Sequence, residues 1–177
     1  MLPYLDRVTL WEPGAGNVAW LRRETLRLRG DWPWTPFWEQ LADAQPTAYK
    51  PVTPRLALAH AATVHQGTVW DLPAARFDVG TMFFVAESMT SEYGIFEAAT
   101  GRFVRALRPG APFAAGFMTG SVGYEIAGQE FPAVPVEEPE IADALASVAR
   151  DVELHPIITG EPVRPGVGMI LATGRAR

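Results

Sequence analysis

The sequence predicts an α/β fold built on a parallel sheet with an antiparallel edge at its carboxyl-terminal end. Strand-like and amphipathic helical segments alternate along most of the 177 residues, an order typical of helices that cover a parallel sheet. Residues 77–86 are almost continuously apolar, as expected of a strand that is covered on both faces. Residues 152–158 and 168–173 are both strand-like with no helix between them, which predicts the antiparallel pair.

The first part of the chain is predicted to contain one strand followed by helices. Residues 8–11 are apolar or β-branched and lie between turn residues, which predicts a buried strand whose carboxyl end is marked by Glu12. Residues 31–38 hold two prolines and four aromatic residues, which indicates an insertion rather than a regular element. Helices are predicted at residues 17–29, 37–44 and 55–62.

The rest of the chain is predicted to alternate strands with two helices. The first helix has an apolar face that includes Phe103, and it ends at residues 108–110, where a basic residue, proline and glycine form a stop signal. The second helix, at residues 137–149, carries carboxylates in its first turn, where they favour the helix dipole. Strands are predicted at residues 63–69, 77–86, 112–118, 152–158 and 168–173.

The composition predicts a cytoplasmic globular domain. Apolar residues make up 48% of the chain, enough to bury a substantial core. The net charge is −5 and the 15 basic residues are scattered, so nucleic acid is not an expected partner. Cysteine is absent and the three histidines lack metal-ligand spacing, so no metal site is expected, and the lack of cysteine fits a reducing cytoplasm. No apolar run reaches the ~20 residues of a membrane span, and no signal-peptide pattern begins the chain.

Residues 14–19 match the pattern GxGxxA between a strand and a helix. In dinucleotide-binding folds this pattern seats a pyrophosphate on a helix N-terminus, so an NAD-dependent oxidoreductase is one hypothesis. However, Glu12 and Pro13 interrupt the approach to the glycine turn. In addition, no second strand ends in an acid ~20 positions later. A glycine turn that simply starts a helix is therefore the favoured interpretation.

An acidic residue, Glu12, closes the first predicted strand. A carboxylate at this end of a parallel strand can accept two hydrogen bonds from ribose hydroxyls, and ligands bind along this edge of open α/β sheets. A solvated carboxylate at a strand end is the alternative interpretation. The local pattern leaves both open.

Four segments carry a resemblance to a known family. They are residues 8–12 with Asn17, residues 77–81 leading to Glu87, residues 107–110 and residues 123–131. Together they resemble the nicotinamide, phenylethanolamine and indolethylamine N-methyltransferase family, in particular an actinobacterial branch of it. The segment 123–131 is the most specific of them. The resemblance implies a Rossmann-like class I fold that uses S-adenosyl-L-methionine to methylate nitrogen or oxygen of a small-molecule acceptor.

The resemblance also assigns roles to individual residues. Its cofactor-binding positions correspond to Glu12, Asn17, Thr68, Val69 and Phe83. Its acceptor-binding positions correspond to Glu87, Ser88, Ser121 and Tyr124. Two positions depart from the family, because Thr68 replaces the usual adenine-binding acid and Phe117 stands where the amine methyltransferases have a substrate-orienting acid. The first departure implies a weaker or backbone-mediated contact with adenine, and the second puts amine specificity in doubt.

In this resemblance the strand that ends at Glu12 is the second of the fold, and a central strand with a glycine-rich loop would precede it. Residues 1–177 are therefore expected to form a single, amino-terminally incomplete methyltransferase domain with an insertion at about residues 30–62. An in-frame stop codon immediately upstream in the DNA would count against a shortened chain. The alternative function is a non-catalytic binding or partner protein that has lost cofactor binding.

Several other side chains leave two interpretations open. The aromatic residues of the insertion form either a lid over a flat or cationic acceptor or a satellite core under a long loop. Phe83 and Phe84 either line the cofactor pocket or belong to the sheet core. His65 is either a general base or a structural histidine. Glu87 is the first candidate for a base if the acceptor is a hydroxyl. The aromatic residues in question are Trp32, Trp34, Phe37 and Trp38.

Overall fold

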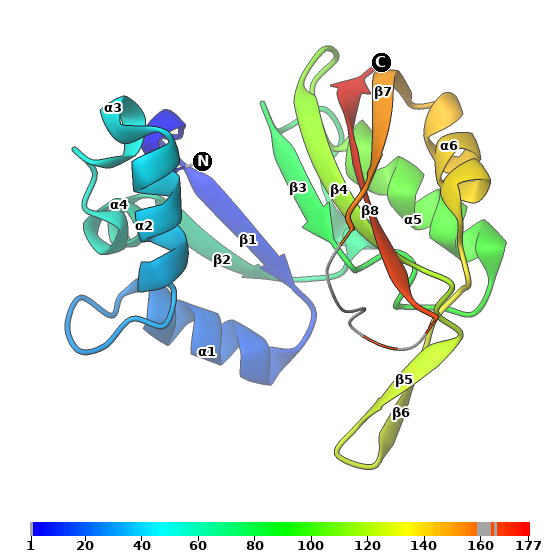
Figure 1. Ribbon diagram of the computed structural model, residues 1–177, viewed down its shortest axis with the longest axis horizontal. Coiled ribbons are helices and arrows are strands. Elements are labelled where there is room, and N and C mark those ends of the chain that lie inside the picture. Colours follow the sequence, from blue (N-terminus) through cyan, green and yellow to red (C-terminus); the bar gives the residue numbers. More distant parts are fainter. Residues whose placement is uncertain (1, 159–163, 165) are drawn as a thin grey trace. The chain divides into compact units, whose positions relative to one another are not determined.

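The computed structural model describes residues 2–158, 164 and 166–177. The chain divides into two compact units, an amino-terminal unit (Met1–Thr68) and a carboxyl-terminal unit (Val69–Arg177). Figure 1 shows the elements of each unit. That residues 1–177 form a single domain remains a prediction.

The amino-terminal unit holds a two-stranded parallel sheet, formed by β1 (Val8–Glu12) and β2 (Ala62–Gln66). After a short 3-10 turn, η1 (Leu2–Tyr4), and strand β1, the chain forms a series of helices before β2 (Figure 1). Three of them have a proline in the first or second position, which fits the first helical turn because its N–H groups have no partner inside the helix. The predicted strand and the three predicted helices are confirmed to within a few residues, whereas the short helix α3 was not predicted. The helices are α1 (Ala15–Thr25), α2 (Thr35–Ala44), α3 (Pro46–Tyr49) and α4 (Pro54–Ala61).

The carboxyl-terminal unit holds a four-stranded sheet in the order β3-β4-β8-β7 (Figure 1). The β3–β4 pair is parallel, whereas β4–β8 and β8–β7 are antiparallel. The predicted α/β fold with an antiparallel edge is therefore confirmed. The four strands are β3 (Gly80–Phe83), β4 (Pro112–Thr119), β7 (Ala149–Pro156) and β8 (Gly168–Ala176).

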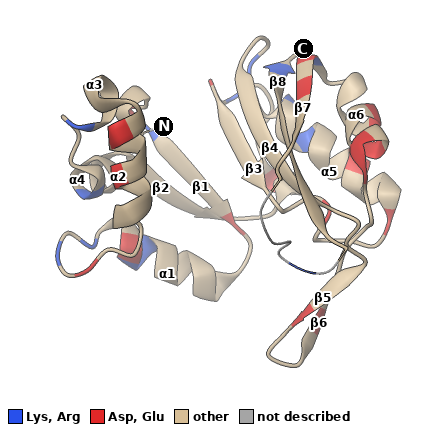
Figure 2. Ribbon diagram, in the orientation of Figure 1, with Lys and Arg blue, Asp and Glu red and all other residues tan. Residues whose placement is uncertain are grey.

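Two helices contribute to the core of this unit, α5 (Tyr93–Arg105) and α6 (Glu138–Ala146). Glu137 and Glu140 form a reciprocal capping box at the start of α6, beside the acidic first turn that Figure 2 shows in red. Apolar residues recur every three or four positions along one face of α5, and two of them, Phe96 and Val104, are 0% exposed. Phe117 of the sheet is also 0% exposed. Phe96 and Phe117 meet edge to face, with ring centroids 5.7 Å apart.

The strand predicted at residues 77–86 is much shorter than the apolar run that predicted it. Phe77 makes only an isolated bridge to Leu107, and regular pairing begins at Gly80. The strand ends at Phe83, because Phe84 adopts a positive φ of 58° and turns the chain after its N–H donates to the Gly116 carbonyl. The run is almost continuously apolar, but apolar character alone does not fix where a strand stops.

A hairpin that the sequence did not predict follows β4. It is formed by β5 (Gly123–Ile126) and β6 (Gln129–Pro132), which pair antiparallel. The two connecting residues, Ala127 and Gly128, have φ values of 52° and 79°, as a two-residue turn of type I′ requires. Alanine is an uncommon residue in the first of these positions, which is why the turn gave no clear sequence signal.

The β2 strand is also shorter than predicted. It ends at Gln66, where the Gly67 N–H donates to the Glu12 carbonyl, and residues Val69–Asp71 form a 3-10 turn, η2.

No helix of the described residues is long and apolar enough to cross a membrane. The same residues contain no group of histidine and acidic side chains that could hold a metal ion.

Candidate functional site

The carboxylate of Glu12 is held in place at the carboxyl end of β1. Its Oε1 accepts hydrogen bonds from the backbone N–H of Gly14 at 2.8 Å and from Nδ2 of Asn17 at 3.0 Å. No described residue donates to its Oε2. The structure thus brings together Glu12 and Asn17, both predicted to bind the cofactor, and leaves one carboxylate oxygen available as an acceptor.

Gly14 leaves the space that this carboxylate occupies. Its φ of −75° and ψ of 116° are open to any residue, but a Cβ at this position would lie 2.9 Å from Oε1 of Glu12. The Gly14 N–H, which a pyrophosphate would use at the start of α1, is already donated to Glu12. A negative carboxylate at this point also repels phosphate groups. The geometry therefore disfavours the dinucleotide interpretation of residues 14–19.

The adenine-binding positions of the resemblance fall where the two units are divided. Thr68 is the last residue of the amino-terminal unit, and Val69 is the first of the carboxyl-terminal unit, where it packs against the core. His65, which precedes them on β2, stacks on Trp11 of β1 with ring centroids 5.0 Å apart and an interplanar angle of 16°. This contact supports a structural role for His65.

Phe83 and Phe84 are not part of the sheet core. Phe83 is 49% exposed and Phe84 is 41% exposed. The Phe83 ring lies across Gly116 of β4, where a Cβ would come within 2.9 Å of its Cδ1. These exposed fractions disfavour the interpretation that the two rings belong to the sheet core. They leave the rings accessible to a ligand.

Glu87, beyond the end of β3, is completely buried. Its Oε1 accepts a hydrogen bond from the Met118 N–H at 3.0 Å, near the carboxyl end of β4. Its Oε2 has no hydrogen-bond partner among the described residues. Burial raises the pKa of the Glu87 carboxyl above its ordinary 4.5, and the bond from Met118 opposes this rise only in part. Such an unpaired buried oxygen is uncommon in proteins and often marks a functional group.

The raised pKa of Glu87 predicts how stability depends on pH. Because the folded protein binds this proton more tightly than the unfolded chain, its contribution to stability is complete below pH 4.5, the ordinary value, and is lost as the pH rises through the higher folded-state pKa. Glu87→Gln should remove this part of the pH dependence in urea unfolding measured at a series of pH values. The exposed replacement Glu130→Gln is the control, and parallel curves for wild type and Glu87→Gln would contradict the prediction.

Ser121 and Tyr124, two of the predicted acceptor-binding residues, are joined through Arg164. One guanidinium nitrogen donates to Oγ of Ser121 at 3.2 Å and another to the Gly123 carbonyl at 3.1 Å. The same guanidinium lies 5.4 Å from the ring centroid of Tyr124, whose other neighbour is the stacked ring of Phe131. Sequence reasoning missed Arg164, because a single arginine 43 residues after Ser121 carries no local signal. Ser88, the remaining acceptor position, is half-buried.

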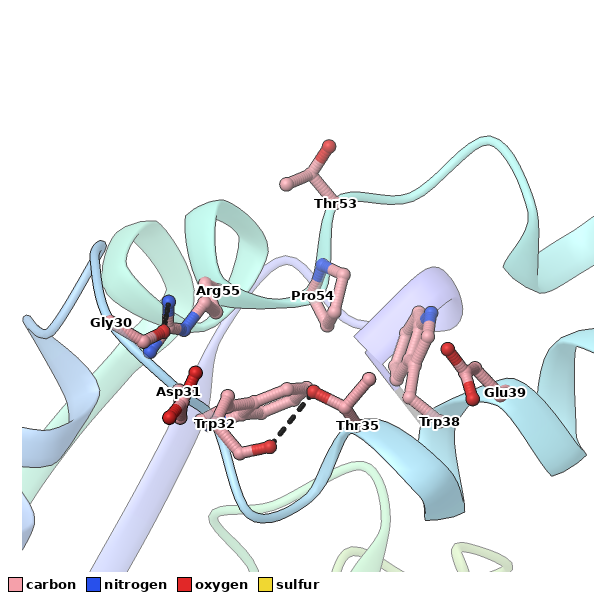
Figure 3. Close-up of a pocket in the computed structure, with 9 residues that line it drawn as sticks. All are labelled: Gly30, Asp31, Trp32, Thr35, Trp38, Glu39, Thr53, Pro54 and Arg55. Carbon is pink, nitrogen blue, oxygen red and sulfur yellow. Dashed lines mark hydrogen bonds between the residues drawn. The ribbon is translucent and has the colours of Figure 1, made fainter.

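The four aromatic residues of the insertion do not act as one group. Trp34 and Phe37 are exposed by 49% and 60% and contact each other at 5.9 Å. In contrast, Trp32 and Trp38 are half-buried and line a pocket (Figure 3). The satellite-core interpretation therefore fails for Trp34 and Phe37, whereas the other two are placed to contact a ligand.

No protein-family model matches the sequence, and neither does any curated protein. Solved structures do match. Over 96% of its length the chain is similar to 1,6-didemethyltoxoflavin-N1-methyltransferase from Burkholderia thailandensis, crystallised with 1,6-didemethyltoxoflavin and S-adenosylhomocysteine. The two chains are 18% identical with a TM-score of 0.52, and the match covers 71% of that enzyme. An S-adenosylmethionine-dependent methyltransferase from Methanosarcina mazei matches 96% of this chain and 93% of its own, with 10% identity and a TM-score of 0.53.

The fold is that of the Rossmann-like methyltransferases. At these identities the likeness establishes the fold alone, and the resemblance to the nicotinamide and phenylethanolamine N-methyltransferase family remains a prediction. Function must be argued from the site, because one fold carries many activities.

Proposed function

We propose that this chain acts as part of an S-adenosylmethionine-dependent methyltransferase. The enzyme transfers a methyl group to a nitrogen or oxygen atom of a small-molecule acceptor. The observation that carries the proposal is the Glu12 carboxylate, fixed through Oε1 and left open at Oε2 at the carboxyl end of a parallel strand. This is the edge at which open α/β sheets bind their ligands. The methyltransferase fold agrees with it, and the proposal places the protein in the cytoplasm.

The hydrogen-bond acceptor that Glu12 offers fits a ribose better than it fits a phosphate. Two adjacent hydroxyls donate hydrogen bonds and need acceptors, which a carboxylate provides. Asn17 and Gly14 already fix the orientation of this carboxylate, so little freedom is lost when it binds. Beside Glu12 and Asn17, the proposal assigns cofactor contacts to Thr68, Val69 and Phe83. The bound cofactor supplies a methyl group on a sulfonium, so the protein itself needs no nucleophile.

The proposed acceptor contacts belong to the carboxyl-terminal unit. Ser121 and Tyr124 are held by Arg164, and Glu87 reaches the same end of β4 through Met118. In this proposal Glu87 accepts the proton of a hydroxyl acceptor, and Ser88 contributes a polar group next to it. A raised pKa makes the ionised carboxylate a stronger base, which suits this task. Phe117 is completely buried against Phe96, so its position offers no acid to orient an amine.

The proposal is tested by isothermal titration of the chain with S-adenosylhomocysteine. Glu12→Gln should weaken binding by roughly 10- to 100-fold, the usual value of a hydrogen bond to a charged group. Asp43→Asn, which changes an exposed carboxylate of α2 that pairs with Lys50 at 3.9 Å, is the matched control and should leave the affinity unchanged. Equal affinities of wild type and Glu12→Gln would remove Glu12 from the ribose site.

Two other functions predict different titrations. A non-catalytic partner protein that has lost the cofactor site predicts no heat with S-adenosylhomocysteine, although circular dichroism shows a folded chain. An NAD-dependent oxidoreductase predicts saturable binding of NADH instead. The Gly14 geometry already weighs against the second of these.

A further inference from the structure

The amino-terminal unit contains a pocket that the proposed methyl transfer does not use. Its volume is about 400 Å³, within the range of small-molecule sites. Trp32 and Trp38 form aromatic walls, and Pro54 closes the space opposite the Trp32 ring (Figure 3). The charged groups around the rim are Asp31, Glu39 and Arg55. None of these residues belongs to the proposed cofactor or acceptor sites.

The aromatic walls are fixed by neighbouring contacts. The Trp38 ring packs edge to face on Tyr49 at 5.2 Å, and Tyr49 is itself 6% exposed and touches Tyr4 at 6.2 Å. The Trp32 carbonyl accepts hydrogen bonds from the N–H and the hydroxyl of Thr35, at 3.0 and 2.8 Å. The Trp38 ring and the Trp32 backbone are therefore held in position before any ligand arrives, which lowers the entropic cost of binding.

The guanidinium of Arg55 serves the structure of the pocket. It donates to the carbonyls of Gly30 at 2.9 Å and Arg29 at 3.3 Å, and it lies 6.0 Å from the centroid of the Trp32 ring. Gly30 has a φ of 84°, a conformation that favours glycine, and this turn presents its carbonyl to Arg55. The two Nη groups of Arg55 are thus directed at the loop, whereas its Nε is buried without a hydrogen-bond partner among the described residues.

The two carboxylates of the rim give the pocket a negative balance. Among the described residues, neither Asp31 nor Glu39 takes part in an ion pair within 4 Å. Both are exposed, so they attract a charged ligand from solution without being buried themselves. Two carboxylates against one guanidinium favour a cation, and the electron-rich faces of tryptophan favour the same charge.

From these observations we infer that this pocket binds a small organic cation, with its ammonium or quaternary ammonium group against Trp38 and the carboxylates of Asp31 and Glu39 nearby. A weakly hydrated organic cation satisfies both the aromatic walls and the negative rim. A neutral ring would use only the walls, and an anion would be repelled. The inference does not rest on the proposed methyltransferase function, because it uses different residues.

Choline is the probe for this inference, and 3,3-dimethylbutan-1-ol, which has the same shape without the charge, is its neutral control. In calorimetric titrations of the full chain, choline should give saturable binding that weakens as salt is added. The neutral alcohol should bind at least roughly threefold more weakly. Equal binding of the two compounds, or no saturable heat with choline, would overturn the inference.

Paired variants locate the site. Trp38→Leu should weaken choline binding by roughly three- to tenfold, whereas Trp34→Leu, which changes an exposed ring outside the pocket, should not change it. The double replacement Asp31→Asn with Glu39→Gln alters only exposed side chains, so it keeps the test valid if Trp38→Leu fails to fold. This double variant should also weaken choline binding while leaving the neutral alcohol unaffected. Choline affinity that is unchanged in the double variant, or lowered equally by Trp34→Leu and Trp38→Leu, contradicts the inference.

Discussion

Replacing Glu87 by glutamine is expected to slow methylation of a hydroxyl acceptor by about 10²- to 10⁴-fold, the usual contribution of a general base. Glutamine keeps the size of the side chain and can still accept the hydrogen bond from Met118 through its amide oxygen. It cannot take a proton. The measurement is the initial rate of S-adenosylhomocysteine release with a hydroxyl acceptor found by screening.

Two comparisons separate this role from a structural one. The same variant should methylate an amine acceptor at a nearly unchanged rate, because a neutral amine attacks without a base. The pH profile with the hydroxyl acceptor should also lose its rise with increasing pH, since that rise reports ionisation of Glu87. An unchanged rate with the hydroxyl acceptor would exclude Glu87 as the base.

Phe117→Ala is expected to lower the free energy of unfolding of the carboxyl-terminal unit by about 3–5 kcal/mol. Phe117 is 0% exposed on β4, packs on Phe96 and lies opposite Ile170 of β8. Removing its ring leaves a cavity in the middle of the core, because the two strands and α5 cannot close around the smaller side chain. Urea unfolding followed by circular dichroism measures the change.

The control for this variant is Ile126→Ala. Ile126 belongs to the β5–β6 hairpin of the same unit and is 60% exposed. Its replacement should change the free energy of unfolding by no more than about 0.5 kcal/mol. A loss for Phe117→Ala as small as that of the control would show that Phe117 is not a central core residue.

The sequence predicted the regular elements well because their signals are local. The apolar spacing of Phe96, Val104 and neighbouring residues placed α5, and Glu12 marked the end of β1. The exact extent of β3 was not predictable, since the positive φ of Phe84 has no signature in a run of apolar residues. The hairpin at residues 123–132 was missed for a similar reason, because its turn uses alanine.

The candidate site was predictable only in part. The bond between Glu12 and Asn17 spans five residues and follows from a strand, a glycine turn and a helix in succession. The contacts of Glu87 with Met118 and of Ser121 with Arg164 span 31 and 43 residues, so they depend on how strands pair. The different exposure of Phe37 and Trp38 likewise depends on the phase of α2, which turns these two neighbouring side chains in different directions.

A crystal structure of the chain with S-adenosylhomocysteine would show directly whether Glu12 holds the ribose. A ribose hydroxyl should lie within hydrogen-bonding distance of Oε2 of Glu12, while Oε1 keeps its bonds to Gly14 and Asn17. A nucleoside bound elsewhere, with Oε2 of Glu12 facing only solvent, would contradict it.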